Sequence, residues 1–377
     1  MNTVIKSPYN EWVIYLNFGN ACSGASLRLV SIMQRRTALF VPFLLASGLA
    51  AKAGARAAYR GPVFQEVATS EYQWNSTAVS RTGRVFTSFP TRNEFPSFHV
   101  GELRGGVTVS FLPRDVNESL VNVSNIFIDD ADRLWILDSG KLAGRPVNKS
   151  AARLICVNIT HRMVLQTFRI PSELLESNST LANVRVDSQQ NIAFISDGGA
   201  GGLIVLDLES GKGWLGLDRS VQQTRANAKF LALPTGNYYP IMPNIAALAL
   251  SEDRRTLYFT PLIETKIYSI PTHILRDRSL RSHDRARYIM TEARDAFPSA
   301  GMVERSGVLY FGDVRHDRVA SLHLMTHRVS EMKTPTPIRW ADGFSLDSRG
   351  NIWFTESESN VPVQRRSAYR LFRIVWA

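Results

Sequence analysis

The sequence predicts an all-β fold: a six-bladed β-propeller of four-stranded antiparallel blades. Three observations predict it. An apolar strand pair split by a tight polar turn recurs six times, the copies are about one blade apart, and long helical periodicity is absent between them. One aromatic residue in the second strand of each pair marks the copies, at Phe86, Trp135, Phe194, Tyr258, Tyr310 and Trp353.

The second and sixth copies show the pattern most clearly. In the second, strand 125–129 and strand 134–138 flank the turn 130–133, and in the sixth, strand 344–347 and strand 352–356 flank the turn 348–351. We expect the marker aromatics to pack between neighbouring blades. We also expect the C-terminal strand 369–375 to pair with residues near Val63–Val67, which would close the ring.

The first 57 residues lie outside the repeat. Gln34-Arg35-Arg36 precedes an apolar run over residues 37–51, and Ala55-Arg56-Ala57 is a small-x-small cleavage signature. We therefore predict an N-terminal extension and signal peptide over 1–57, with translation starting at Met33 and cleavage after Ala57. Residues 58–377 then form a single propeller domain. An anchor that stays attached is the alternative, and the paired arginines also permit a twin-arginine signal.

Six Asn-x-Ser/Thr triplets support secretion, since such triplets accept glycans on exposed parts of secreted proteins. The predicted glycosylation sites are Asn75, Asn117, Asn122, Asn148, Asn158 and Asn178. The alternative is that several of them are never modified. We expect a secreted, extracellular protein that is not held in a membrane after signal cleavage.

Cysteine content and charge exclude several classes of protein. Cys22 lies in the leader, so Cys156 in its apolar run is expected to be a small buried hydrophobe without a disulfide partner. The whole chain carries a formal charge of +11, and its leader holds six Lys/Arg and one Glu, which leaves about +6 for the mature chain. Five arginines between Arg276 and Arg287 predict a solvated basic loop rather than a nucleic-acid site. We expect a monomer.

Propeller topology gathers the candidate site residues at one mouth of the central channel. In each blade the inner strand begins, and the second strand ends, at the same face, because the two strands form an antiparallel hairpin. The predicted ligand-binding residues at this mouth are Asn125, Asn183, Asn244, Asp313 and Glu356, and the predicted catalytic residues are Asp138, Asp197, His316 and Asp342. The turns at the opposite face are expected to need only turn chemistry.

These side chains permit two kinds of chemistry. The oxygens of Asn125, Asn183 and Asp342 could ring a ligand or a calcium ion, and crowded carboxylates or His316 could move protons. The alternatives are strand-end caps, aspartates that accept local backbone hydrogen bonds, and an exposed loop histidine. The sequence has no paired-cysteine or His-Glu-x-x-His spacing and no nucleotide motif, so we expect no resident metal or cofactor, with calcium the one option left open.

Several segments resemble the yellow/major royal jelly protein family, including its microbial, dopachrome-tautomerase-like branch. Two of them are Asp132-Arg133-Leu134-Trp135-Ile136-Leu137-Asp138 and Trp340-Ala341-Asp342-Gly343-Phe344. The others are residues 78–86, 193–197, 201–208, 257–262 and 307–312. The resemblance implies a secreted six-bladed propeller with a small-molecule pocket at one end of its channel.

The resemblance also implies several possible roles. Family members are associated with pigment and melanin chemistry, with dopachrome isomerisation, or with amine binding and nutrition. This chain departs from the family in two respects. The disulfides of the animal members cannot form, and Ala246-Ala247 and Ser299-Ala300-Gly301 stand where polar, ligand-facing groups would be expected.

Two functions of different class follow, and both use a small-molecule ligand. The first is an isomerase or tautomerase of a quinone-like or aromatic metabolite, acting through the acidic channel mouth and His316 in pigment or secondary metabolism. The second is a non-catalytic secreted protein that binds a small aromatic or amine. A calcium-dependent lactonase is a third and less favoured option.

Overall fold

The structure is a computed structural model that describes residues 61–91, 96–227, 230–231, 244–362 and 365–376, and the backbone alone of 3–6, 13–16, 232 and 238–239. The chain divides into two compact units, Met1–Ala57 and Ala58–Ala377. In the first unit, β1 (Thr3–Lys6) pairs antiparallel with β2 (Val13–Leu16). The predicted translation start, apolar run and cleavage site lie outside the described residues.

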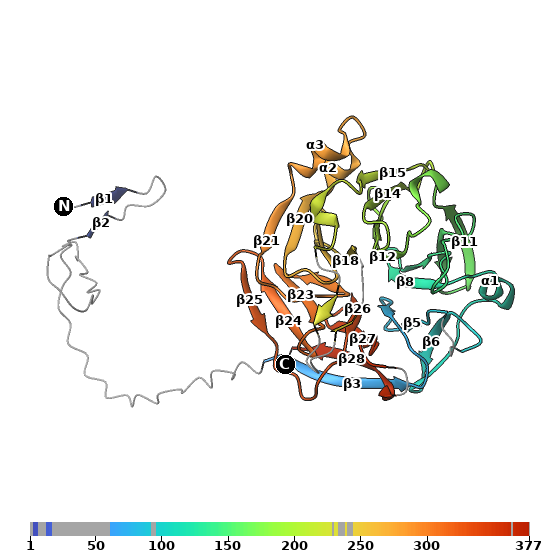
Figure 1. Cartoon of the computed structure of the whole chain (residues 1–377). Coiled ribbons are helices and arrows are strands. Elements are labelled where there is room, and N and C mark those ends of the chain that lie inside the picture. Colours follow the sequence, from blue (N-terminus) through green and yellow to red (C-terminus); the bar gives the residue numbers. More distant parts are fainter. Residues whose placement is uncertain are drawn as a thin grey trace, which may run out of the picture. The chain divides into compact units, whose positions relative to one another are not determined.

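The second unit confirms the predicted fold, because six four-stranded antiparallel sheets are arranged around a central axis (Figure 1). Blade 1 contains β4 (Ser76–Val79), β5 (Val85–Ser88), β6 (Val100–Arg104) and β7 (Val107–Ser110). Blade 2 contains β8 (Val123–Ile128), β9 (Arg133–Asp138), β10 (Arg153–Asn158) and β11 (Met163–Arg169). Blade 3 contains β12 (Leu181–Asp187), β13 (Ile192–Asp197), β14 (Leu203–Asp207) and β15 (Gly213–Leu217).

The remaining blades follow the same order. Blade 4 contains β18 (Ile245–Leu250), β19 (Thr256–Pro261), β20 (Ile267–Pro271) and β21 (Met290–Ala293). Blade 5 contains β22 (Met302–Arg305), β23 (Val308–Asp313), β24 (Arg318–His323) and β25 (Arg328–Glu331). Blade 6 contains β26 (Ala341–Leu346), β27 (Ile352–Glu356), β28 (Tyr369–Val375) and β3 (Val63–Ser70).

Short helices and one small strand pair lie in the connections. The helices are α1 (Arg114–Glu118), η1 (Ser172–Leu174), η2 (Gln222–Thr224), α2 (Thr272–Arg276) and α3 (Ser282–Ala286). The small pair is β16 (Leu231–Ala232) with β17 (Tyr238–Tyr239). In the described part of the chain, no helix is both long enough and apolar enough to cross a membrane.

The ring closes by the predicted pairing of the two ends of the propeller. Strand β3 forms the outer edge of blade 6, antiparallel to β28, in a register that runs from Tyr369 opposite Ser70 to Val375 opposite Val63. The last blade therefore takes three strands from the C-terminal end of the chain and one from residues 63–70. Backbone hydrogen bonds between segments some 300 residues apart hold the circle shut.

The marker aromatics pack between blades, as predicted. Apolar side chains form six buried clusters, one at each contact between neighbouring blades, and each cluster contains one marker aromatic. Trp135, for example, packs with Leu154 of its own blade and with Val184 and Ile195 of blade 3. Cys156 is buried in the same cluster and is not part of a disulfide, and burial raises the pKa of its thiol to about 12.

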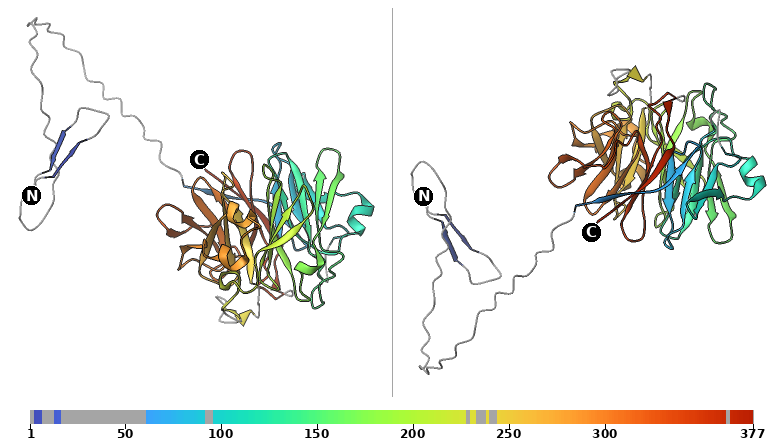
Figure 2. Two further views of the ribbon diagram at one scale, coloured as in Figure 1. Left: turned by 90° about the horizontal axis from the view of Figure 1, so that it is seen from above. Right: turned by 90° about the horizontal axis from the view of Figure 1, so that it is seen from below.

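The propeller has two faces, which the side views of Figure 2 show edge-on. We call the face where the inner strands begin and the second strands end the loop face. We call the opposite face, where short turns join each inner strand to its second strand, the turn face. The six inner strands, β4, β8, β12, β18, β22 and β26, surround the central channel between them.

Candidate functional site

Four inner strands are irregular near the loop face, and this irregularity directs their polar side chains. The antiparallel register shifts between Val123 and Asn125, Leu181 and Val184, Ile245 and Ala247, and Asp342 and Ser345. A β-bulge bends a strand and re-aims its side chains. Asn125, for instance, is buried, and its Oδ1 accepts a hydrogen bond from the backbone N–H of Val184 in the next blade at 3.2 Å.

A buried arginine lies at the centre of the channel. Arg185 of β12 is 5% exposed, and its Nη1 donates to Asn183 Oδ1 at 2.8 Å and to the Val184 carbonyl at 2.7 Å. Its Nη2 crosses to blade 5 and donates to the Met302 carbonyl at 3.0 Å. The guanidinium also lies 5.7 Å from the centre of the Phe127 ring. Burial lowers the pKa of Arg185 to about 10, and the charge of Asp342 opposes that shift.

Asp342 lies where the last blade meets the first. Its Oδ1 accepts the backbone N–H of Gly343 at 2.8 Å, and its charge acts on Arg185 across the channel. Gly343 has a positive φ of 57°, and an added Cβ would lie 2.2 Å from Ser76 Cα of blade 1. Only glycine fits this position, because both the backbone conformation and the close approach exclude a side chain.

The amide oxygens predicted to ring a cation already accept hydrogen bonds. Calcium takes six to eight oxygen ligands, whereas Asn125 and Asn183 already accept hydrogen bonds and the Arg185 guanidinium lies beside Asn183 within the field of Asp342. Among the described residues, moreover, no three or more His, Cys, Asp and Glu side chains are grouped to hold a metal ion. The calcium option at this level of the channel stays a prediction.

Two of the predicted catalytic carboxylates accept hydrogen bonds from loops of their own blades. Asp138, at the end of β9, is fully buried and accepts the backbone N–H groups of Val121, Asn122 and Gly140 at 3.1, 2.9 and 3.2 Å. Asp197, at the end of β13, accepts the hydroxyl of Ser179 at 2.6 Å and the N–H of Thr180 at 2.8 Å. These bonds match the local hydrogen-bonding alternative, while a catalytic role for either aspartate stays a prediction.

Asp313, one of the predicted ligand-binding residues, forms a pair with the predicted catalytic histidine, His316. Asp313, fully buried at the end of β23, accepts a hydrogen bond from Arg318 Nε at 2.8 Å and contacts His316 Nδ1 at 2.8 Å. The His316 side chain is 46% exposed and meets the Phe297 ring edge-on at 5.6 Å between centres. Asp313 therefore orients an imidazole whose other nitrogen can face solvent, an arrangement that suits proton transfer.

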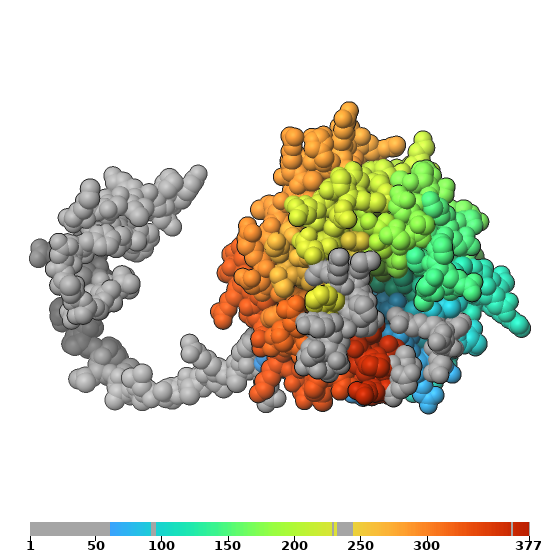
Figure 3. All heavy atoms as spheres, viewed as in Figure 1, coloured from blue at the N-terminus to red at the C-terminus, as the bar shows by residue number. Residues whose placement is uncertain are grey.

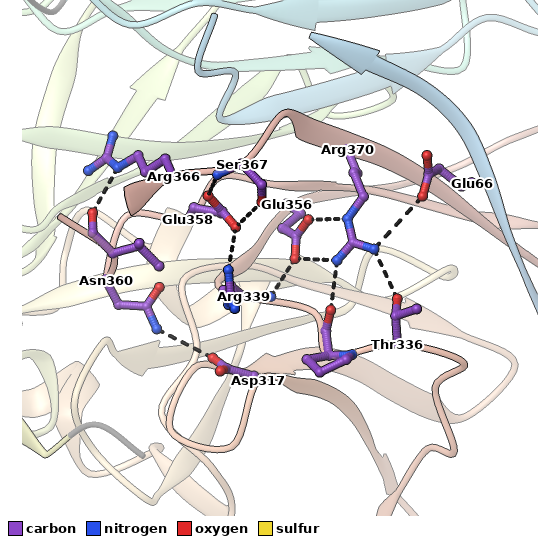
Figure 4. Close-up of polar contacts among 12 residues, drawn as sticks. Glu66, Asp317, Thr336, Arg339, Glu356, Glu358, Asn360, Arg366, Ser367 and Arg370 are labelled. Carbon is purple, nitrogen blue, oxygen red and sulfur yellow. Dashed lines mark hydrogen bonds and ion pairs between the residues drawn. The ribbon is translucent and has the colours of Figure 1, made fainter. Parts of the chain in front are cut away.

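Glu356 ends β27 and belongs to a polar network at the loop face of blade 6 (Figure 4). It is fully buried and accepts the Arg339 backbone N–H at 2.6 Å and Arg370 Nη2 at 2.7 Å. In the same network the Asn360 amide lies 3.4 Å from Asp317, and burial raises the pKa of that aspartate. Asn244 acts similarly between blades 3 and 4, where its amide donates to the Gly199 carbonyl at 2.9 Å.

An apolar cluster lies at the loop face where polar groups had been expected. Leu231 is buried against a group that includes Ala246 of blade 4, Ala300 at the start of blade 5, and Trp340. The yellow segment near residue 230 lies beside the orange blades in Figure 3, which views this face. The two alanines therefore have a packing role, because a larger polar residue at either position would displace Leu231.

The turn face, where only turn chemistry was expected, contains a cavity of about 530 Å³. All six inner strands or the turns that follow them contribute to its wall. The apolar residues of the wall are Ala78, Val79, Phe127, Ile128, Val186, Leu250, Val303, Phe344 and Leu346, and the polar residues are Arg81, Asp129, Asp130, Arg185, Ser251, Glu252, Arg254, Glu304, Ser345, Asp347 and Ser348. Small-molecule sites combine apolar surface with a small number of polar groups and have volumes in this range, and this wall adds eight charged side chains to its apolar surface.

Charged side chains from different blades meet around this cavity. Arg254, in the turn of blade 4, forms an ion pair with Asp130 of blade 2, and its Nε lies 4.0 Å from Asp187 of blade 3. Glu304 of blade 5 is buried and accepts the backbone N–H groups of Glu252 and Gly307 at 2.9 and 2.6 Å. Burial nevertheless raises the pKa of Glu304.

The structure thus brings some predicted residues together and separates others. Asn183 and Asp342 both interact with Arg185, and Asp313 contacts His316. The side chains of Asp138, Asp197 and Glu356 instead accept hydrogen bonds from groups within their own blades and adjoining loops. Sequence reasoning missed Arg185 and the cavity at the turn face. The available signal was a single arginine within the strand Asn183-Val184-Arg185-Val186, since a charge between apolar residues of an inner strand must face the channel or a partner.

Comparison with known proteins identifies the family. A profile of the major royal jelly protein family matches residues 121–335, more than half of the chain, so the chain belongs to that family. It is 26% identical over 282 residues to major royal jelly protein 1 of Apis mellifera, across 71% of this chain and 62% of the relative. It is 23% identical over 229 residues to protein yellow of Drosophila guanche, across 55% of this chain and 39% of the relative. The chain thus spans less than two thirds of either relative, and membership of the microbial branch stays a prediction.

Solved structures share the fold at low sequence identity. A gluconolactonase from Xanthomonas campestris superposes with a TM-score of 0.53 at 13% identity, covering 86% of this chain and 93% of the enzyme. A luciferin-regenerating enzyme gives a TM-score of 0.53 at 11% identity, covering 84% of this chain and 95% of that protein. These likenesses show the propeller architecture alone.

Proposed function

We propose that this chain is a secreted, non-catalytic member of the major royal jelly protein family that binds a small aromatic metabolite in the turn-face cavity. The carrying observation is the cavity of about 530 Å³ that the inner strands of all six blades enclose. Phe127 and Phe344 contribute aromatic carbon to the cavity wall, and Arg185 contributes a fixed, buried charged group. Secretion is supported by the leader pattern and the glycosylation triplets.

Binding is favoured over catalysis by the state of the predicted acids. Asp138, Asp313 and Glu356 have no exposed surface, and each accepts hydrogen bonds from backbone N–H groups or arginines. A general acid or base must reach the proton that it transfers. The burial and the hydrogen bonds of these carboxylates therefore support a role in stabilising loops over a role in proton transfer.

Isothermal titration with three indoles of different charge tests the proposal: neutral indole, cationic tryptamine and anionic indole-3-acetate. Val303→Trp should fill the cavity and weaken binding of the best probe by about tenfold or more, equivalent to about 1.4 kcal/mol. Val164→Trp, on the exposed outer strand β11, is the matched control and should leave affinity within about twofold. Binding that survives Val303→Trp, or the failure of all three indoles to bind, would overturn the proposal.

A tautomerase is the second candidate, and the His316–Asp313 pair favours it. The 2.8 Å contact orients a half-exposed imidazole at the loop face, and Asp317 nearby has a pKa raised by burial. His316 would then move a proton between two positions of a quinone-like ring without a redox cofactor. Colour loss from dopachrome tests this, since His316→Gln should abolish any turnover above a boiled control while His161→Gln, in the turn after β10, should preserve it. Equal turnover in both variants would exclude His316.

A further inference from the structure

A second cavity lies at the turn face between blades 1 and 6. It has a volume of about 290 Å³, and three arginines from separate elements contribute to its wall. Arg81 comes from the turn after β4, Arg349 from the turn after β26, and Arg373 from β28. We call this cavity, with Arg81, Arg349 and Arg373, the arginine notch.

The positive charge of the notch is not balanced by its own walls. Among the residues that the structure describes, no carboxylate forms an ion pair with any of these three arginines. The Arg349 side chain is exposed, and Arg373 donates to the neutral Gln65 Oε1 at 3.0 and 2.6 Å while lying 5.3 Å from the centre of the Trp353 ring. Arg81 Nη2 contacts the Asp130 carbonyl, which is also uncharged. Each guanidinium thus keeps its full charge and has N–H donors to spare.

The one acid in the wall is already occupied. Asp347 Oδ1 accepts the backbone N–H groups of Arg349 and Asn351, both at 2.9 Å. Its Oδ2 accepts the Asn351 amide at 2.9 Å and the Trp353 indole N–H at 3.0 Å. Burial alone would raise the pKa of Asp347, but these hydrogen bonds hold it below its ordinary value. One fixed negative charge therefore faces three positive ones.

A fourth arginine adds to the field. Arg305, at the end of β22, lies so close to the turn of blade 6 that a Cβ added at Gly350 would be 3.1 Å from its Nε. Its guanidinium lies 4.0 Å from the centre of the Trp376 ring, and within the described part of the chain it too lacks a carboxylate partner. Like charges repel, so gathering them around one cavity costs stability unless an anion binds between them.

We infer that the arginine notch binds an oxyanion group, a sulfate or a phosphate. Guanidinium groups present paired N–H donors that match two oxygens of such a group, and they are more weakly hydrated than ammonium groups. The notch and the larger cavity share Val79, Arg81, Asp347 and Ser348 in their walls. If the proposed function holds, the ligand is therefore an aromatic metabolite that carries a sulfate or phosphate, with its ring in the channel and its anionic group in the notch.

Inorganic sulfate and phosphate test the notch independently of the larger cavity. In titration calorimetry at low ionic strength, with chloride as the ionic-strength control, either anion should bind the wild-type protein. Arg349→Gln should weaken this binding by about fivefold or more, since it removes one charge from the cavity without breaking a contact that holds the fold. Arg328→Gln, an exposed arginine on the outer strand β25, removes the same charge elsewhere and should change affinity by less than about twofold. If neither anion binds, or if the two variants lose affinity equally, the inference that the notch binds an oxyanion is wrong.

Indoxyl sulfate and indole then test the connection between the two cavities. Indoxyl sulfate should bind the wild-type protein more tightly than indole and lose that advantage in Arg349→Gln. If inorganic sulfate binds but indoxyl sulfate is no tighter than indole, the notch is a site for a free anion and the shared-ligand inference is wrong. If indole binds and sulfate does not, the notch fails while the proposed function stands.

Discussion

The carboxylate of Asp129 accepts the indole N–H of Trp135 at 2.8 Å, and Asp347 holds Trp353 in the same way at 3.0 Å. In both blades the aspartate directly follows the inner strand, its other oxygen accepts two backbone N–H groups two and four residues further on, and the tryptophan packs between blades. One side chain thus joins the turn to the marker aromatic. A buried indole N–H commonly pairs with an acceptor, and the turn aspartate is that acceptor in both blades.

Asp129→Ala is expected to lower the free energy of unfolding by about 3 kcal/mol, because it leaves the N–H groups of Ala131, Arg133 and Trp135 without their acceptor. Urea unfolding followed by tryptophan fluorescence measures the change. Asp115→Ala, at an exposed position in α1, is the control and should shift stability by less than about 0.5 kcal/mol. An unchanged urea midpoint for Asp129→Ala would show that the turn does not depend on this acid.

Removal of strand β3 is expected to abolish cooperative unfolding. A chain that begins at residue 71 lacks the strand that pairs with β28, and it exposes the outer edge of blade 6. A chain that begins at residue 58 keeps the closure and should melt as the full chain does. Calorimetry of the two truncations makes the comparison. A sharp transition from the shorter chain would mean that blade 6 is stable with three strands.

The architecture could be predicted because its determinants are local and repeated. Each strand pair carries its own turn, and each marker aromatic occupies the same place in its hairpin, so the six copies confirm one another. The closure could also be predicted, because the last blade contains only β26, β27 and β28 from its own stretch of chain, so its fourth strand must come from the segment before blade 1. The structure bears out both predictions.

The candidate site was less predictable, because it depends on contacts between distant residues. Leu231, in the connection between β15 and β18, packs on Ala246 and Ala300, and the local sequence does not predict that contact. Arg185 reaches across the channel to the Met302 carbonyl, 117 residues further along the chain. The acids at the ends of β9 and β13 were correctly placed at the loop face, but a strand pattern does not reveal which backbone groups a carboxylate will accept.

Glu102 is expected to make stability depend on pH in the acid range. Burial alone would raise its pKa, but ion pairs with Arg84 and Arg104, both at 2.6 Å, hold the pKa below its ordinary value in the folded protein. The pKa of Glu102 is lower in the folded than in the unfolded state. Its ionised form therefore contributes fully to the free energy of unfolding above the unfolded-state pKa, and this contribution is lost as pH falls through the folded-state pKa. Wild-type stability should therefore fall more steeply than that of Glu102→Gln below about pH 5. Parallel slopes in urea titrations at several pH values would contradict this.

Glycan attachment is expected at Asn148 and Asn158 and not at Asn117 or Asn75. Asn117 is buried, with its amide donating to the Ser97 carbonyl at 3.0 Å, and the Asn75 amide donates to the Ser124 carbonyl at 2.9 Å. The Asn148 and Asn158 oxygens accept hydrogen bonds from their own turns, which leaves the amide nitrogens clear of other groups in the described structure. Deglycosylation in ¹⁸O water followed by peptide mass spectrometry, on protein secreted from a eukaryotic host, reads out each site. A fully occupied Asn117 would refute the assignment.

Asn183→Ala and Asp138→Ala are expected to show which end of the channel binds the ligand. Asn183 accepts a hydrogen bond from Arg185 at 2.8 Å, so its loss should loosen one side of the guanidinium and weaken binding of an indole in the turn-face cavity by about fivefold. Asp138 accepts three backbone N–H groups at the loop face, so its loss should cost about 3 kcal/mol of stability and leave affinity unchanged. Calorimetric titration measures the indole affinity of each variant, and urea unfolding measures its free energy of unfolding. The opposite pattern, in which Asp138→Ala abolishes binding but leaves the protein stable, would place the ligand at the loop face, among the acids that the sequence predicted as the site.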